Sequence, residues 1–348
     1  MHFIIGGVNV PRPNSKSHIN VLLQIISEFG HSYAFEGSGD LLLNLDHSDA
    51  SINAWKSQNA VLKPIILLRL ETQSVFPEQY KTEVENQYTK IYTIGVIDET
   101  CKGESLGYPY LPAINHLEQE ETLYFTQEFK NNVERSIYEK DLWEKRSKKI
   151  VFIGSNKFIP NDYLYALRRN VLEREMKNGT IEVYGQFWTK SILRRAFYFS
   201  AIARYSLRVG NSINLFRNLH WVFKNYPTAK GTIYDKLNLL KQSQYNLIIE
   251  NSPGFVTEKL FDAILCGAVP IYLGANFKSG SLLEKCIIRV TESELLTSNL
   301  ELIIKQSDYS VNLILESMVS FMSSKEYAEN WSARGVYLRL LRDLTPEV

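Results

Sequence analysis

Short hydrophobic runs recur through the first third of the chain, separated by polar turns and by stretches with helical spacing. The runs have strand length and contain few charges, which is typical of strands buried on both faces of a sheet. They cover residues 2–5, 40–45, 64–70 and 91–96. Ser17 can cap a helix over 18–29, and Gly30 follows it. This alternation of strands and helices predicts a parallel sheet.

A second series of strands and helices runs from about residue 150 to about residue 290. Within it, 247–249 is a short apolar run and 250–254 is polar and turn-forming. Thr257 can cap the next helix, which carries Glu258 and Lys259 in its first turn. Ligands of parallel α/β proteins bind where strands end and helices begin. We therefore expect this Thr-Glu-Lys cluster to hold an anionic, hydroxylated ligand.

The same pattern predicts how the chain is organised. We expect a Rossmann-like N-terminal domain with connecting helices at residues 1–148 and a second Rossmann-like domain at 149–325, followed by a C-terminal helix at 326–348. The two halves would face each other across a cleft. At 348 residues, 45% of them hydrophobic, the chain is long enough for two ordinary cores.

Composition excludes several classes of protein. The net charge of +1 disfavours a general nucleic-acid binder. The 3 cysteines and 6 histidines have neither disulfide nor metal-ligand spacing, and the chain contains no Asp-x-Asp motif. No run approaches the ~18 apolar residues of a membrane-spanning helix, and the first ten residues do not have the pattern of a signal peptide.

The segment 245–274 resembles the signature of the family 10 glycosyltransferases, the α-1,3/1,4-fucosyltransferases. The matching residues are Tyr245, Glu250, Asn251, Ser252, Thr257, Glu258, Lys259, Leu260, Val269, Pro270 and Gly274. The spacer after Ser252 is shorter than in the family, and Phe255 stands where the family has tyrosine. The resemblance implies the GT-B fold and GDP-fucose as donor. The departures leave open another nucleotide-linked deoxysugar, and a non-catalytic glycan- or nucleotide-binding protein is a further alternative.

Two upstream stretches extend the resemblance. Residues 149–156 are similar to a family strand that ends in Ser-Asn, and the helix after it carries an arginine that binds the donor diphosphate in the family. Arg169 is our choice for that arginine and Arg168 is the alternative, with Tyr184 also near the donor. Leu68-Arg-Leu-Glu71 is similar to the stretch after which the family places its catalytic carboxylate.

From this resemblance we expect a metal-independent, inverting fucosyltransferase without a cofactor. Glu71 would be the general base, with Asp98 and Glu99 as fallbacks. Without an Asp-x-Asp motif, Lys259 and Arg169 must neutralise the diphosphate. Asn251, Ser252, Thr257 and Glu258 would contact polar donor groups. Glu250 is either a ligand contact or a buried carboxylate that binds the backbone.

Residues 187–234 form a basic and aromatic segment. No acidic residue stands between Phe187 and Tyr234, while arginines such as Arg194, Arg195 and Arg204 alternate with aromatic residues. The segment could dock on an anionic membrane, or its aromatic residues could pack into the core. Golgi members of the family carry a membrane anchor that we do not find in this sequence, so we expect a bacterial-type cytoplasmic enzyme that can also lie peripherally at the inner membrane. Its acceptor would be a glycan of a surface polysaccharide or lipopolysaccharide.

Overall fold

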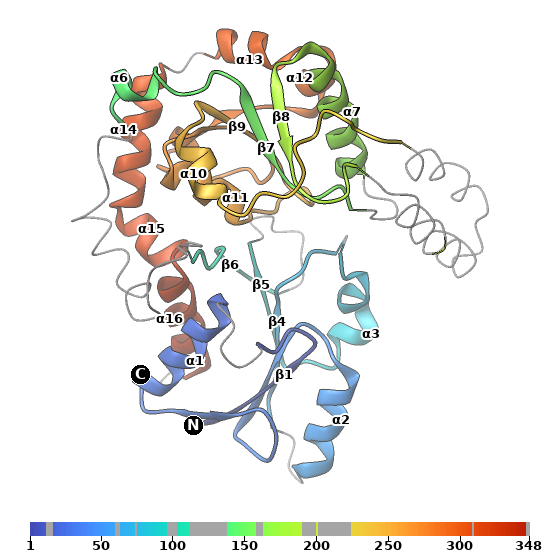
Figure 1. The fold of residues 1–348 in the computed structure, drawn as a ribbon. Helices are drawn as coiled ribbons and strands as arrows, with labels where there is room; N and C mark the ends of the chain where they lie inside the picture. Colours follow the sequence, from blue (N-terminus) through green and yellow to red (C-terminus); the bar gives the residue numbers. More distant parts are fainter. Residues whose placement is uncertain are drawn as a thin grey trace.

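A computed structural model gives the arrangement of most of the chain (Figure 1). The described residues are 1–11, 17–59, 63–73, 75–95, 103–111, 138–157, 163–189, 200, 224–307 and 310–345. Two parallel sheets, each with helices packed on it, lie one above the other in this view. This agrees with the two α/β halves that the hydrophobic pattern predicts.

The N-terminal sheet has six parallel strands in the order β2-β1-β3-β4-β5-β6. Its strands are β1 (His2–Gly7), β2 (Ser32–Ala34), β3 (Leu41–Leu45), β4 (Ile65–Arg69), β5 (Lys90–Ile94) and β6 (Glu104–Leu106). Its helices are α1 (His18–Glu28), α2 (Asp49–Gln58), the 3-10 helix η1 (Pro77–Tyr80) and α3 (Thr82–Glu85). The strand order reverses between β1 and β3, which is where α/β proteins place ligands.

The C-terminal sheet has five parallel strands in the order β11-β10-β9-β7-β8. These are β7 (Ile150–Ile153), β8 (Ile181–Tyr184), β9 (Tyr245–Ile249), β10 (Val269–Leu273) and β11 (Ile288–Arg289). Its order reverses between β7 and β9. The helices are α6 (Lys140–Trp143), α7 (Tyr163–Asn178), α10 (Lys236–Lys241), α11 (Glu258–Leu265), η3 (Glu284–Cys286), α12 (Glu292–Thr297), α13 (Leu300–Gln306), α14 (Val311–Met322), α15 (Lys325–Asn330) and α16 (Ala333–Leu344).

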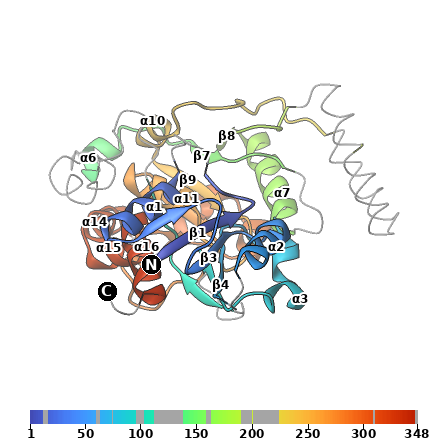
Figure 2. The same cartoon turned by 90° about the horizontal axis from the view of Figure 1, so that it is seen from below.

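The last helix, α16, returns to the N-terminal half of the molecule (Figures 1 and 2). Its apolar residues Val336, Tyr337, Leu340 and Leu341 are buried in the same core as β1, β3 and α1. Asp343 adds contacts with side chains of β5. The chain therefore crosses between the two halves twice, and the end of the sequence stabilises the N-terminal sheet.

Direct hydrogen bonds join the two halves beside α11. The Val256 amide donates to the carbonyl of Gly95 at 2.7 Å. Gly95 has φ +70°, and a Cβ there would lie 2.6 Å from the Val256 carbonyl oxygen, so the close approach requires glycine. Tyr110, after β6, donates to Asp262 of α11 at 2.8 Å. The start of α11 therefore lies at the boundary between the halves.

The ends of the basic and aromatic segment pack inward. Trp188 is fully buried and donates through Nε1 to the Gly154 carbonyl at 2.7 Å. Tyr226 packs edge-on against it, with ring centroids 5.2 Å apart. Lys224 forms an ion pair with Glu173 of α7. These residues follow the core-packing alternative, while 190–199 and 201–223, with Arg194, Arg195 and Arg204, lie outside the described residues. Among the helices that the structure describes, none is long and apolar enough to span a membrane.

Candidate functional site

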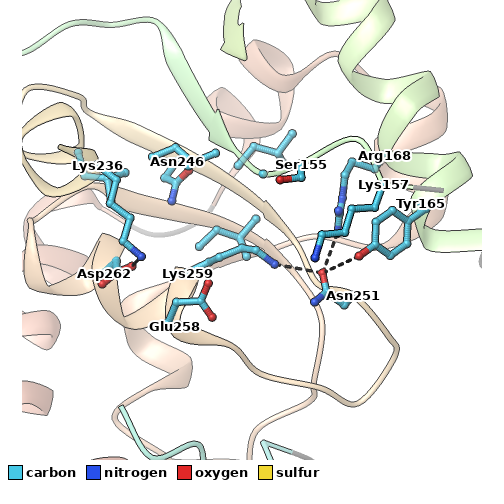
Figure 3. Close-up of a pocket in the computed structure, with 15 residues that line it drawn as sticks. Ser155, Lys157, Tyr165, Arg168, Lys236, Asn246, Asn251, Glu258, Lys259 and Asp262 are labelled. Atoms are coloured by element: carbon cyan, nitrogen blue, oxygen red, sulfur yellow. Dashed lines mark hydrogen bonds and ion pairs between the residues drawn. The ribbon is translucent and has the colours of Figure 1, made fainter. Parts of the chain in front are cut away.

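A cavity of about 260 Å³ opens where the C-terminal sheet reverses its strand order (Figure 3). The loop after β7, the strand β9 and the N-terminus of α11 form most of its wall. The polar side chains along it come from Ser155, Lys157, Tyr165, Arg168, Lys236, Asn246, Asn251, Glu258, Lys259 and Asp262. The cavity lies where the topology of a doubly wound sheet places a ligand.

Glu250 is buried and fixes the loop between β9 and α11 through hydrogen bonds. Its carboxylate is fully buried and accepts hydrogen bonds from the Thr257 amide at 2.9 Å and the Thr257 hydroxyl at 2.8 Å. Burial raises the pKa of this carboxyl, and Lys259 opposes the increase. Of the two roles considered for Glu250, the geometry matches the carboxylate that binds the backbone. Thr257 is the N-cap residue of α11 by position, but its hydroxyl donates to Glu250 rather than accepting a helix amide.

Lys259 brings a positive charge to the first turn of α11. Its Nζ donates to Asn251 Oδ1 at 3.2 Å and lies 3.6 Å from Glu250 Oε2. The side chain is 19% exposed, which keeps the charge partly shielded from solvent. Figure 3 shows this side chain reaching across the cavity toward Asn251. Asn251 and Glu258 both line the cavity beside it, as the motif predicts for neighbours of a ligand.

Arg168, rather than Arg169, lies on the cavity wall. Its guanidinium donates to the carbonyl oxygens of Ile249 at 2.6 Å and Glu250 at 3.2 Å, and it lies over the Tyr165 ring at 4.4 Å. Arg168 therefore fixes the end of β9 and adds positive charge to the wall. Arg169 is half-buried, is not part of the lining, and acts electrostatically on Tyr226.

Two further predicted donor residues lie away from the lining. The Tyr184 hydroxyl donates to Glu182 at 2.9 Å on the same strand, and burial raises its pKa to about 12. Ser252 is largely buried, and its carbonyl accepts the Phe255 amide at 3.3 Å. The Phe255 ring is buried beside Gly95 of the other half.

The far end of the cavity holds an ion pair that sequence reasoning missed. Lys236 of α10 lies 2.5 Å from Asp262 of α11, which also accepts from Tyr110. Burial raises the pKa of the Asp262 carboxyl, and Lys236 opposes the increase. In the lining, Lys157, Arg168, Lys236 and Lys259 outnumber Glu258 and Asp262, so the wall is cationic overall. Such a surface is suited to a phosphate-bearing ligand.

Glu71 follows β4 in the opposite half of the molecule. Burial raises the pKa of the Glu71 carboxyl most, and the carboxylate of Asp46 raises it further. Lys157 lowers this pKa, and Glu258 has a smaller raising effect. Lys157 and Glu258, which line the cavity, therefore act electrostatically on Glu71 from the other half of the molecule. Asp98 and Glu99, the fallbacks, lie outside the described residues. Within the described ranges, no group of three or more His, Cys, Asp or Glu residues could hold a metal ion.

The chain was compared with protein families, curated proteins and solved structures, and only the solved structures show similarity. No family model matches the sequence, and no curated protein matches it either. The structure is similar to a crystal structure of an α1,3-fucosyltransferase, with TM-score 0.51 and 15% identity over 99% of this chain and 89% of that one. It is similar to the α1,3-fucosyltransferase structure with GDP, with TM-score 0.50 and 14% identity over the same shares.

A third similar structure broadens the comparison. An α-glucosyltransferase in complex with UDP and a 13-mer DNA has TM-score 0.52 and 11% identity, covering 99% of both chains. At these identities the likeness concerns the fold. The chain has the two-domain, Rossmann-like GT-B fold, as the sequence predicts.

Proposed function

We propose that this protein is an inverting glycosyltransferase that transfers fucose from GDP-fucose to a glycan acceptor without a divalent metal. The observation that carries the proposal is the cationic cavity at the β7/β9 reversal, with Lys259 in the first turn of α11. A helix N-terminus and a partly shielded lysine favour a bound diphosphate. The GT-B fold is compatible with this chemistry, since solved structures with the fold are named as fucosyl- and glucosyltransferases.

In this reaction no protein side chain would form a bond to the sugar; the protein would accept a proton and stabilise charge. The acceptor hydroxyl loses its proton to the Glu71 carboxylate while its oxygen bonds to the anomeric carbon of the donor. The bond from that carbon to the diphosphate breaks, and the electron pair leaves with GDP. Lys259, the amides at the start of α11 and the cationic wall then stabilise the charge that develops on the diphosphate. Glu258 and Asn251 would orient donor hydroxyls through hydrogen bonds.

A second candidate keeps the reaction and changes the donor to another nucleotide-linked deoxysugar. Phe255 motivates it, because a phenyl ring has no hydroxyl to donate where the fucosyltransferases carry tyrosine. The ring packs beside Gly95 at the boundary between the halves. The similar α-glucosyltransferase structure contains UDP, so the fold also accommodates another base.

Nucleotide binding separates these candidates. We expect GDP at 100 times its Kd to stabilise the protein by about 2.7 kcal/mol in a thermal shift assay. UDP, dTDP and CDP at equal concentration should have smaller effects, and EDTA should change none of them. A preference for another nucleotide would replace GDP-fucose by a different donor. No response to any of the four would favour a non-catalytic protein, and loss of the GDP response in EDTA would contradict metal independence.

The acceptor and its location form a further part of the proposal. We expect a glycan of a bacterial surface polysaccharide or lipopolysaccharide, reached by peripheral contact of the 187–234 segment with an anionic membrane. Flotation with vesicles of anionic lipid should carry the protein upward at low salt. Charge reversal at Arg194, Arg195 and Arg204 together should leave it at the bottom of the gradient. Flotation on neutral vesicles, or an unaffected triple variant, would contradict electrostatic docking by these residues.

A further inference from the structure

The main chain of Glu71 is held from both sides by hydrogen bonds to side chains. Asp46 Oδ1 accepts the amides of Leu70 at 2.8 Å and Glu71 at 3.3 Å. The Glu71 carbonyl accepts Gln79 Nε2 at 3.1 Å and the Tyr80 hydroxyl at 3.0 Å. Four hydrogen bonds from three side chains thus converge on one short stretch after β4. So many polar contacts specify one backbone position.

Asp46 is itself fixed at the reversal point of the N-terminal sheet. It directly follows β3, is fully buried, and has φ +57°, which is uncommon for a residue with a side chain. Its Oδ2 accepts Asn9 Nδ2 at 2.5 Å from the loop after β1, and its amide donates to the Leu68 carbonyl at 2.9 Å. A backbone conformation of this kind costs free energy and persists where its surroundings determine it.

The Glu71 carboxylate contrasts with this fixed main chain. Across the described residues, no hydrogen bond or ion pair binds its side-chain oxygens. The charges that act on it are Asp46 on its own half of the molecule, and Lys157 and Glu258 on the other half. Its main chain is anchored, while its carboxylate is under the electrostatic influence of Lys157 and Glu258 of the other half.

We propose that Asp46 is a positioning residue for Glu71: one buried carboxylate oxygen fixes the Glu71 main chain, and the other is anchored by Asn9 beside β1. The inference rests on the proposed function insofar as Glu71 is the general base. Preorganisation of this kind is required because small displacements of a reacting group reduce rates steeply.

The negative charge of Asp46 has a second consequence. Burial and the Asp46 carboxylate both raise the pKa of Glu71, so the group is a stronger base when ionised. A base acts only when deprotonated, so activity should rise with pH through this pKa. Removal of the Asp46 charge should lower the pKa and move the rise to lower pH. Lys157 and Glu258, which act in opposite directions, remain unchanged in this comparison.

Two variants separate position from charge. In Asp46→Asn the side-chain oxygen can still accept the Leu70 and Glu71 amides, and the new amide group can donate to Asn9 once the Asn9 side chain turns over, so kcat at high pH should be largely retained. Its kcat/KM profile should rise at lower pH than that of the unmodified enzyme. In Asp46→Ala the anchor is lost, and kcat should fall roughly 10- to 100-fold with donor affinity little changed.

Glu175→Gln is the matched control. Glu175 is another fully buried carboxylate, which accepts Arg174 and Thr180 at 2.8 Å within the C-terminal half. It should alter thermal stability without moving the pH profile. If Asp46→Asn behaves in the same way, or if Asp46→Ala keeps full kcat, the inference is overturned.

Titration of the Glu71 carboxyl without substrate tests the inference even if the proposed function is wrong. Protein labelled with ¹³C at the glutamate carboxyl carbons gives a Glu71 signal that Glu71→Gln identifies by its absence. The midpoint of that signal should fall in Asp46→Asn and stay in place in Glu175→Gln, even if GDP-fucose proves not to be the donor. An unchanged midpoint in Asp46→Asn would refute the electrostatic coupling between the two carboxylates.

Discussion

Replacement of Lys259 by alanine is expected to lower kcat for transfer at least about a hundredfold, roughly 3 kcal/mol in transition-state stabilisation. The diphosphate gains negative charge as its bond to the sugar breaks. Lys259 supplies a cation at the start of α11, partly shielded from water, where its interaction with that charge is stronger than in bulk solvent. Steady-state kinetics with GDP-fucose and an acceptor measure the loss, and donor hydrolysis serves while the acceptor is unknown.

The control for this variant must account for Glu250. Lys259 lies 3.6 Å from that buried carboxylate, so its removal also weakens the loop. Melting temperatures show how much of the loss is unfolding, and assays well below the melting point exclude that contribution. Lys325→Ala is the matched surface variant, since Lys325 also stands in the first turn of a helix but is 84% exposed. Near-normal kcat in folded Lys259→Ala would remove Lys259 from the mechanism.

The second large effect is expected from Glu71→Gln, which should reduce kcat by roughly 10² to 10⁴ while GDP binding stays unchanged. Glutamine keeps the shape of the side chain but cannot take a proton from the acceptor hydroxyl at neutral pH. GDP contacts would lie on the C-terminal half, away from this substitution. Single-turnover kinetics and calorimetric titration with GDP measure the two quantities separately.

Glu83→Gln provides the comparison, because Glu83 is an exposed carboxylate on α3 in the same half of the molecule. It should leave both turnover and GDP affinity intact. An equal loss of turnover and GDP affinity in Glu71→Gln would show that Glu71 binds the donor or supports the fold. Retained turnover would assign the proton transfer to another group.

Much of the architecture follows from local pattern. Strands buried on both faces are continuous apolar runs, so 64–70 identifies all of β4 and 247–249 identifies most of β9 without tertiary information. A polar loop between such a strand and a helix marks a ligand-binding edge, which is why Asn251, Glu258 and Lys259 could be predicted beside a cavity. These features depend on residues close together in the sequence.

Other features depend on which face of an element meets its neighbours. Arg168 and Arg169 are adjacent on α7, so they point about 100° apart, and only packing against β9 determined that Arg168 lines the cavity. The position of Tyr184 away from the lining was decided in the same way.

Long-range contacts settled the rest. The pattern of residues 326–348 predicts a helix, but its packing against α1 requires a partner some 300 positions earlier. Asp46 and Glu71 follow different strands, and only the parallel register of β3 and β4 brings their loops together. The sequence by itself determined the longer strands and the α11 cluster, because these arise from short-range periodicity; the short strands β2 and β6 were not predicted. Which side chains meet across the two halves was decided by the tertiary structure, because that depends on the relative placement of distant elements.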